Sequence, residues 1–177
     1  MYDSIGVCVA RDDFKPDVKE CLAELLKDEQ PCLLLMRTAI VASMNLGEVR
    51  KFVLTDVIPD LVRKQVWAKT QSRSIWEGVC HFVKRFSGSK DVEQTMRCLL
   101  GLPTAQLKVL IKLAPTAKAA MGKTLKGLSA ADKEEVLSGR WADLDTTTQK
   151  GEKAVLDSDK NKIINQCLAE AAAAPTK

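Results

Sequence analysis

The chain is short of the residues that most often build catalytic or metal sites. Its 177 residues include one histidine, His81, and six cysteines, no two of which stand at Cys-x-x-Cys spacing. Because His81 directly follows Cys80, the two side chains point about 100° apart on a helix, which disfavours a Cys–His pair or a zinc site. No pair of carboxylates is marked for acid–base work. We therefore predict no catalytic residue, no metal and no cofactor.

Long apolar runs and strand patterns are also scarce. No apolar run approaches a membrane span, and Ile5–Ala10 is too short for the apolar part of a signal peptide. Sustained β-branched alternation and Asn-Gly or Asp-Gly turns do not occur. Only Leu107–Leu113 fits a strand as well as a helix by its pattern. The sequence thus predicts an almost wholly helical protein with no membrane association.

Disulfide chemistry is not indicated either. Several cysteines occupy apolar helix positions, where a free thiol behaves as a small hydrophobe. Reduced thiols fit a cytosolic or nuclear compartment. The six positions are Cys8, Cys21, Cys32, Cys80, Cys98 and Cys167.

What the sequence does contain is apolar residues at helical spacing, separated by proline, glycine and polar breaks. Leu33–Met44 is apolar on most sides, which predicts a helix at the centre of a bundle. Pro59 interrupts the stripe Val49–Val66, so we predict a kink or a break there. The fold class is therefore all-α, an irregular bundle or a HEAT-like stack of antiparallel helices. The other helices are expected over Val18–Leu26, Ile75–Phe86, Val92–Leu100 and Pro103–Leu113, after Pro115, and after a Ser129–Asp132 cap.

The composition changes after Trp141. Residues 142–158 are mostly polar and include three consecutive threonines, whereas apolar spacing returns at Ile163 and Ile164. We predict a helical domain over 1–141, a polar linker over 142–158, and a C-terminal helix with a frayed tail over 159–177. The three tryptophans, Trp67, Trp76 and Trp141, stand at helix ends, where packing is their first interpretation.

Two features of the middle of the chain suggest ligands. Ala117–Thr124 reads A-K-A-A-M-G-K-T, the end of a P-loop with its first glycine replaced, but the buried strand with a magnesium-binding Asp that should follow is missing. A helix with solvent-facing lysines is the better interpretation. In addition, no acidic residue occurs between Glu93 and Asp132, and the net charge is +4. The lysines of this interval are candidate partner-binding residues or simply solvated: Lys108, Lys112, Lys118, Lys123 and Lys126.

Four segments resemble motifs of the symplekin C-terminal domain family, in the family's order and with similar spacing. They are Leu35–Ile40 (L-M-R-T-A-I), Lys64–Trp67 (K-Q-V-W), Ile75–Val79 (I-W-E-G-V) and Leu100–Leu107 (L-G-L-P-T-A-Q-L). The resemblance covers about Tyr2–Leu113 well and weakens toward Leu144. Pro59 and the longer Trp67–Trp76 loop depart from the family pattern. The matched residues Arg37, Trp67, Trp76 and Pro103 are expected to be structural, Arg37 because a buried arginine needs carboxylate or carbonyl partners.

The resemblance implies a non-catalytic helical scaffold of nuclear pre-mRNA cleavage and polyadenylation. In that family, the domain joins the processing endonuclease, a metallo-β-lactamase-fold protein, to its inactive paralogue by binding their C-terminal regions. It also implies that this chain is one domain of a longer protein. The alternative, from another class, is an RNA-binding helical-repeat domain that uses the basic stretch 97–126. A nucleotide-dependent enzyme depends on the weak P-loop likeness alone.

Overall fold

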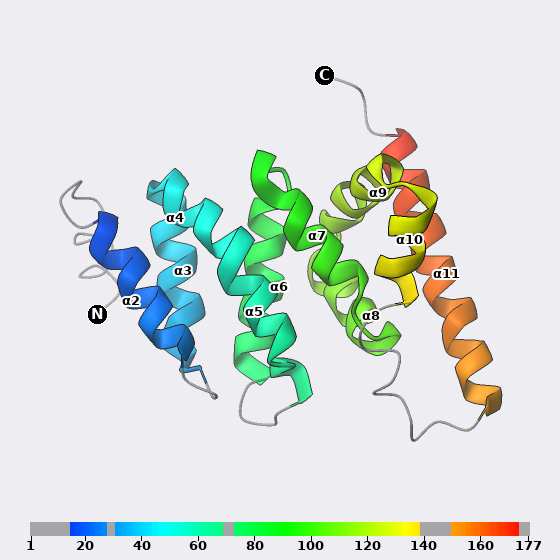
Figure 1. The fold of residues 1–177 in the computed structure, drawn as a ribbon, viewed down its shortest axis with the longest axis horizontal. Coiled ribbons are helices and arrows are strands. Elements are labelled where there is room, and N and C mark those ends of the chain that lie inside the picture. The colour runs from blue at the N-terminus through cyan, green and yellow to red at the C-terminus, as the bar shows by residue number, and fades with distance from the viewer. Residues whose placement is uncertain (1–14, 28–30, 69–72, 139–149, 174–177) are drawn as a thin grey trace. The chain divides into compact units, whose positions relative to one another are not determined.

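The computed structural model describes residues 15–27, 31–68, 73–138 and 150–173, and in these ranges every regular element is a helix. The chain divides into two compact units, Met1–Phe82 and Val83–Lys177, and the division falls inside helix α6. Leu107–Leu113, ambiguous by pattern, is helical because its buried residues Leu107 and Leu110 lie three positions apart on one face. The predicted all-α class is confirmed (Figure 1).

The first unit consists of short helices joined by tight turns. Its elements are α2 (Lys15–Lys27), α3 (Leu33–Asn45), α4 (Gly47–Phe52), a π-helix (Val53–Val57), α5 (Ile58–Arg63), a 3-10 turn (Val66–Ala68) and the first part of α6 (Arg73–Phe86). Helix α3 packs against α2 and α4. Leu35, Met36 and Ala39 on α3 are buried, as the apolar pattern predicts.

Pro59 changes the helical geometry without ending the helix. The segment before it is a π-helix, in which the Ile58 amide donates to the Val53 carbonyl five residues back. Pro59 itself lies in the first turn of α5, where its missing amide costs little. The predicted interruption is therefore a widened turn between two short α-helices, a common way for a helix to accommodate an extra residue. Val53, Leu54, Val57, Ile58 and Pro59 are all buried there.

The K-Q-V-W segment forms the turn that closes α5. Gln65 has a φ of 50°, the left-handed conformation that ends many helices, and its amide donates to the Val62 carbonyl over 3.0 Å. The Lys64 ammonium donates to the Leu26 carbonyl at the end of α2 and pairs with Asp60 at 3.3 Å. The lysine thus ties the ends of two helices together.

Trp67 and Trp76 make the next contact in the chain. Their ring centroids lie 5.5 Å apart with an interplanar angle of 65°, an edge-to-face pair. Trp76 is buried and Trp67 is partly buried. The pair joins the turn after α5 to the first turns of α6.

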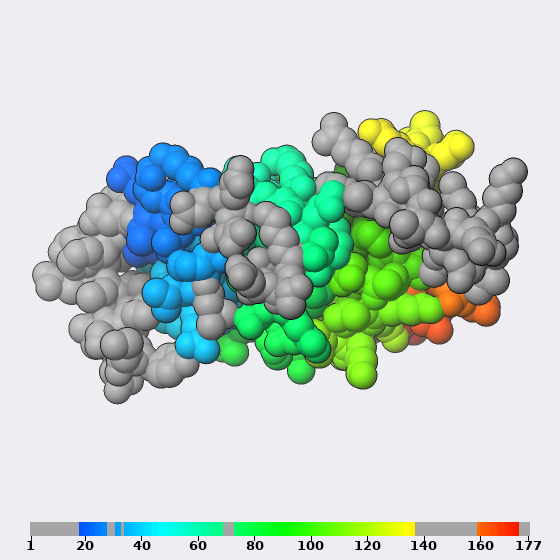
Figure 2. Space-filling model, turned by 90° about the horizontal axis from the view of Figure 1, so that it is seen from below, coloured from blue at the N-terminus to red at the C-terminus, as the bar shows by residue number. Residues whose placement is uncertain are grey.

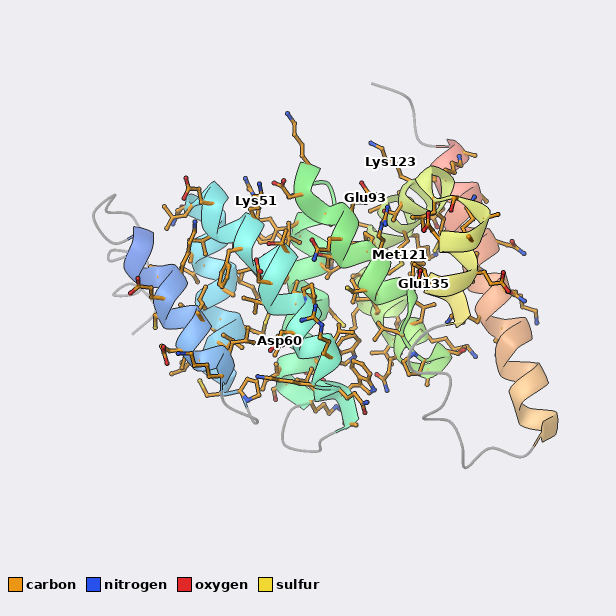
Figure 3. All side chains as sticks on the ribbon, in the orientation of Figure 1. Lys51, Asp60, Glu93, Met121, Lys123 and Glu135 are labelled. Atoms are coloured by element: carbon orange, nitrogen blue, oxygen red, sulfur yellow. The ribbon has the colours of Figure 1, made fainter. Side chains whose placement is uncertain are left out.

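The second unit contains the rest of α6, a 3-10 turn (Lys90–Val92), α7 (Glu93–Leu100), α8 (Thr104–Leu113), α9 (Ala117–Gly127), α10 (Ala130–Ser138) and α11 (Lys150–Ala173). Helix α9 packs against both α7 and α11. Its core is formed by residues such as Met96, Leu99, Leu107, Leu110 and Met121, all fully buried. In Figure 3, Met121 lies among the helices of this unit.

The capping box predicted at Ser129 is present. The Asp132 amide donates to the Ser129 hydroxyl over 3.1 Å, and that hydroxyl donates to the Asp132 carboxylate over 2.6 Å. These hydrogen bonds, led by the one from the Ser129 side chain, hold the pKa of Asp132 below its ordinary value. Helix α10 begins one residue after the serine, as the pattern predicts.

The C-terminal region differs from the predicted boundaries. Helix α11 begins at Lys150, so its first nine residues occupy the sequence that we assigned to a linker ending at residue 158. Polar side chains on an exposed helix resemble a linker in composition, which explains the error. Helix α11 also packs on α9 and α8, and Ala171, expected to have little to bury, lies against Gly122. Trp141 and residues 139–149 lie outside the described residues.

Gly78 sets the approach of α6 to α3, and we expect Gly78→Ala to lower the free energy of unfolding by about 1–3 kcal/mol. A Cβ at position 78 would lie 2.7 Å from the Met36 Cβ, so the two helices must separate. Chemical denaturation monitored by circular dichroism measures the change. Gly127→Ala is the matched control, because a Cβ at that position meets nothing within 4 Å. Equal stability of the two variants would contradict a tight crossing at Gly78.

Candidate functional site

The groups that could support nucleophilic or metal chemistry are separated in space. Cys80 is buried, and burial, with Glu77 nearby, raises the pKa of its thiol to about 12. His81 is exposed on the other side of the helix, as its position one residue later requires. Within the described residues, no three His, Cys, Asp or Glu side chains gather as metal ligands would. The thiol at position 80 therefore stays protonated at neutral pH and packs as an apolar group.

The P-loop-like segment is a helix. Ala117–Thr124 forms most of α9, with Thr124 buried and Lys123 exposed. A P-loop needs an open glycine-rich turn whose amides point at phosphates, whereas the amides of this segment are used inside the helix. Gly122 has a packing role instead, because a Cβ there would lie 2.0 Å from the Cys167 carbonyl oxygen on α11. Figure 3 shows Lys123 extending outward from α9.

The basic stretch 97–126 is partly neutralised by carboxylates from elsewhere in the second unit. Lys108 on α8 pairs with Asp159 at 2.5 Å, and Lys118 on α9 pairs with Glu170 at 3.1 Å. Arg97 pairs with Glu93 one turn away at 2.9 Å. The sequence could not show the first two pairs, because their carboxylates lie more than fifty residues downstream.

Three of the five candidate lysines remain available. Lys112, Lys123 and Lys126 are exposed, and the described part of the chain offers them no ion-pair partner. They come from two helices, α8 and α9, of the same unit. The structure thus reduces the predicted basic stretch to three solvent-facing ammonium groups. Whether they bind a partner stays a prediction.

The residues of the family-like motifs have structural positions, with one exception. Trp67 and Trp76 pack on each other, and Pro103 stands immediately before α8, where its carbonyl accepts from the Leu107 amide over 2.9 Å. Arg37 is the exception, because it is exposed rather than buried. The expectation that it lies inside the core was wrong. Its helix is apolar on most sides, and the pattern did not reveal which side faces water.

Helix α3 presents an apolar face to solvent. Leu34 is 56% exposed and Met44 is 50% exposed, the two highest values among the large apolar side chains that the structure describes. Arg37 and the half-buried Val41 lie between them at helical spacing. Arg37 is the only charged residue of α3. In Figure 2 the light-blue atoms of this segment reach the surface.

This α3 face, defined by Leu34, Arg37, Val41 and Met44, is the site that sequence analysis missed. Apolar side chains without a covering neighbour mark contact surfaces for other proteins. Methionine adapts to partners of varied shape, and arginine supplies a directional charge. The arrangement can bind an amphipathic segment, and it contains no group suited to bond-breaking chemistry. None of the described helices is long and apolar enough to cross a membrane.

We expect magnesium and ATP to leave the melting temperature of the protein unchanged. A ligand that binds the native state must raise the melting temperature, and α9 offers no phosphate loop for one. Differential scanning fluorimetry with and without millimolar nucleotide measures this. Lys123→Ala serves as the comparison, because it should behave as the wild type does. A rise that this variant abolished would restore the nucleotide hypothesis.

Comparison with known proteins adds one match. Residues 1–114 match the family model described as "Symplekin tight junction protein C terminal". The match spans α2 to α8 and includes all four motif segments. No curated protein and no solved structure matches the chain.

Proposed function

The chain belongs to the symplekin C-terminal family, a family of scaffold domains of mRNA 3′-end processing, and we propose that it binds the C-terminal regions of the processing endonuclease and of that enzyme's inactive paralogue. The proposal places the protein in the nucleus, where pre-mRNA is cleaved and polyadenylated. It assigns no catalytic step to this chain.

The α3 face is the observation that carries the proposal. A face with two half-exposed apolar side chains and one arginine suits an amphipathic helix with apolar residues at i, i+3, i+4 and i+7. The distance from Leu34 to Met44 is ten residues, or about 15 Å along the helix, which is enough for about three turns of a partner helix. The face lies within the part of the chain that matches the family.

The physical benefit of such a scaffold is local concentration. Two proteins held on one module meet at an effective concentration in the millimolar range, without any new contact between them. A nuclease whose activity depends on its paralogue is then assembled by the scaffold rather than by chance encounter. Binding that uses a few apolar anchors also leaves the assembly reversible.

We expect Leu34→Asp with Met44→Asp to abolish co-elution of the chain with co-expressed C-terminal regions of the endonuclease and its paralogue in gel filtration. Two carboxylates at the anchors of the α3 face would have to be desolvated on binding, which weakens the complex by about a hundredfold or more. The variant should keep the wild-type melting temperature, because both positions are exposed.

Val109→Asp is the matched control. Val109 is 39% exposed but lies on α8 of the second unit, so the complex should survive this substitution. Loss of the complex in the control but not in the α3 variant would move the binding surface to α8. No complex with the wild-type chain, shown to be folded by circular dichroism, would contradict the proposed partners.

RNA binding is the second candidate function, favoured by the three exposed lysines. Lys112, Lys123 and Lys126 could neutralise three phosphates, so the logarithm of the binding constant should fall with the logarithm of salt concentration with a slope of about −2. Fluorescence anisotropy with a labelled single-stranded RNA measures the slope. Substitution of all three lysines by glutamate should then abolish binding. Absence of binding at low salt would exclude this function.

A further inference from the structure

Helix α11 lies along α9 and reaches α8 (Figure 1). The surface beneath it includes Met121, Gly122 and Leu125, all buried. Ile163, Ile164 and Cys167 are the α11 side chains buried against this surface, among those that the structure describes. We call the surface of α8 and α9 that faces α11 the α8–α9 groove.

The groove admits only a helix with small residues at one point. The backbone of α11 comes so close to α9 that a Cβ on Gly122 would lie 2.0 Å from the Cys167 carbonyl oxygen and 2.7 Å from the Ala171 Cβ. A large side chain at position 171 would prevent this approach for the same reason. Small residues on both helices are a known requirement for such close packing.

Two ion pairs fix the register of α11 in the groove. Asp159 pairs with Lys108 near the start of α8, and Glu170 pairs with Lys118 near the start of α9. The two carboxylates are eleven residues apart, about 16 Å along the helix. Both pairs are partly exposed, with the Lys108 side chain 52% exposed and the Glu170 side chain 48% exposed. Such pairs select a register more than they add stability.

The pairs also make the contact sensitive to acid. The hydrogen bond from Lys108 holds the pKa of Asp159 below its ordinary value. Its favourable contribution is therefore complete above the ordinary aspartate pKa of about 3.9 and is lost as the pH falls below it. At neutral pH both carboxylates are charged and the register is maintained.

Little apolar burial holds α11 in place. The helix has 24 residues, and ordering it costs conformational entropy over its whole length. Against this cost stand two isoleucines and a cysteine as its buried apolar side chains in the described part. Helices near this balance open locally while the rest of the protein stays folded. Helix α11 also lies beyond the residues that match the family model.

We propose that the α8–α9 groove is an exchangeable helix-binding site, filled by α11 within the chain and open to a partner-protein helix of the same chemistry. Such a helix carries two carboxylates eleven residues apart, apolar residues four and five positions after the first, and small residues where α11 has Cys167 and Ala171. When α11 leaves, Lys108 and Lys118 are freed and Gly122 becomes accessible. This inference is independent of the α3 face and of the partners proposed for it.

Cys167 reports the opening of α11 in the full-length chain. Its thiol is buried at the contact with α9, and burial raises its pKa to about 11, so alkylation requires α11 to move away. The rate of alkylation by N-ethylmaleimide, followed at each cysteine by mass spectrometry, measures this opening. Cys80, buried in the first unit, is the internal reference for global unfolding.

Charge reversal on α11 should open the groove without unfolding the protein. In the variant Asp159→Lys with Glu170→Lys, we expect Cys167 to react at least about tenfold faster than in the wild type, while Cys80 keeps its rate. Adding Lys108→Glu and Lys118→Glu should restore slow labelling, because the pairs then reform with their charges exchanged. If Cys167 and Cys80 react at one rate in every variant, α11 opens only when the protein unfolds and the proposal is wrong.

A fluorescein-labelled peptide of residues 150–173 tests occupation of the groove from outside. It should bind the open variant Asp159→Lys with Glu170→Lys and bind the wild type at least about tenfold more weakly, because the attached α11 competes at high effective concentration. Gly122→Ala added to the open variant should abolish peptide binding, whereas Gly127→Ala should not. Failure of the peptide to bind the folded open variant would overturn the proposal.

Discussion

The distance between two packed helices is set by the smallest residue at their crossing, and two glycines make that choice here. Gly78 brings α6 against Met36 of α3 in the first unit, and Gly122 brings α9 against the backbone of Cys167 in the second. A Cβ at either position would have to push a helix away. The buried residues on both sides of each crossing therefore depend on these glycines for their contacts. In each unit, the crossing also determines which face of the packed helix is left over for other partners.

The motifs that place the chain in its family are mostly devices that hold these helices. Lys64 closes α2, Gln65 supplies the left-handed turn after α5, and the Trp67–Trp76 pair holds the start of α6. Their roles are local and geometric, so they identify a fold without marking a binding surface. The surface that suits a partner consists of ordinary residues, Leu34, Val41 and Met44, around a single arginine. Scaffold function in this protein therefore depends on what the core leaves uncovered.

Charge in the second unit follows the same logic. A run of sequence without acidic residues suggests a strongly basic surface, but α11 returns two carboxylates to it from far along the chain. Occupation of the groove by α11 and neutralisation of Lys108 and Lys118 are thus one structural event. Any helix that replaces α11 must satisfy the same two ammonium groups or leave them to water, which makes the groove selective for its occupant.

The sequence by itself determined the helices, because apolar spacing and breakers act locally. It located the widened turn at Pro59, the cap at Ser129 and most helix boundaries within a few residues, and its motif segments identified the family. It did not determine which side of α3 faces water, since that helix is apolar on most sides and only its neighbours decide which face is covered. Nor did it place Asp159 against Lys108 or show that Gly122, read as part of a phosphate loop, is a helix crossing. Those contacts join residues distant in the chain, so only the tertiary structure could decide them.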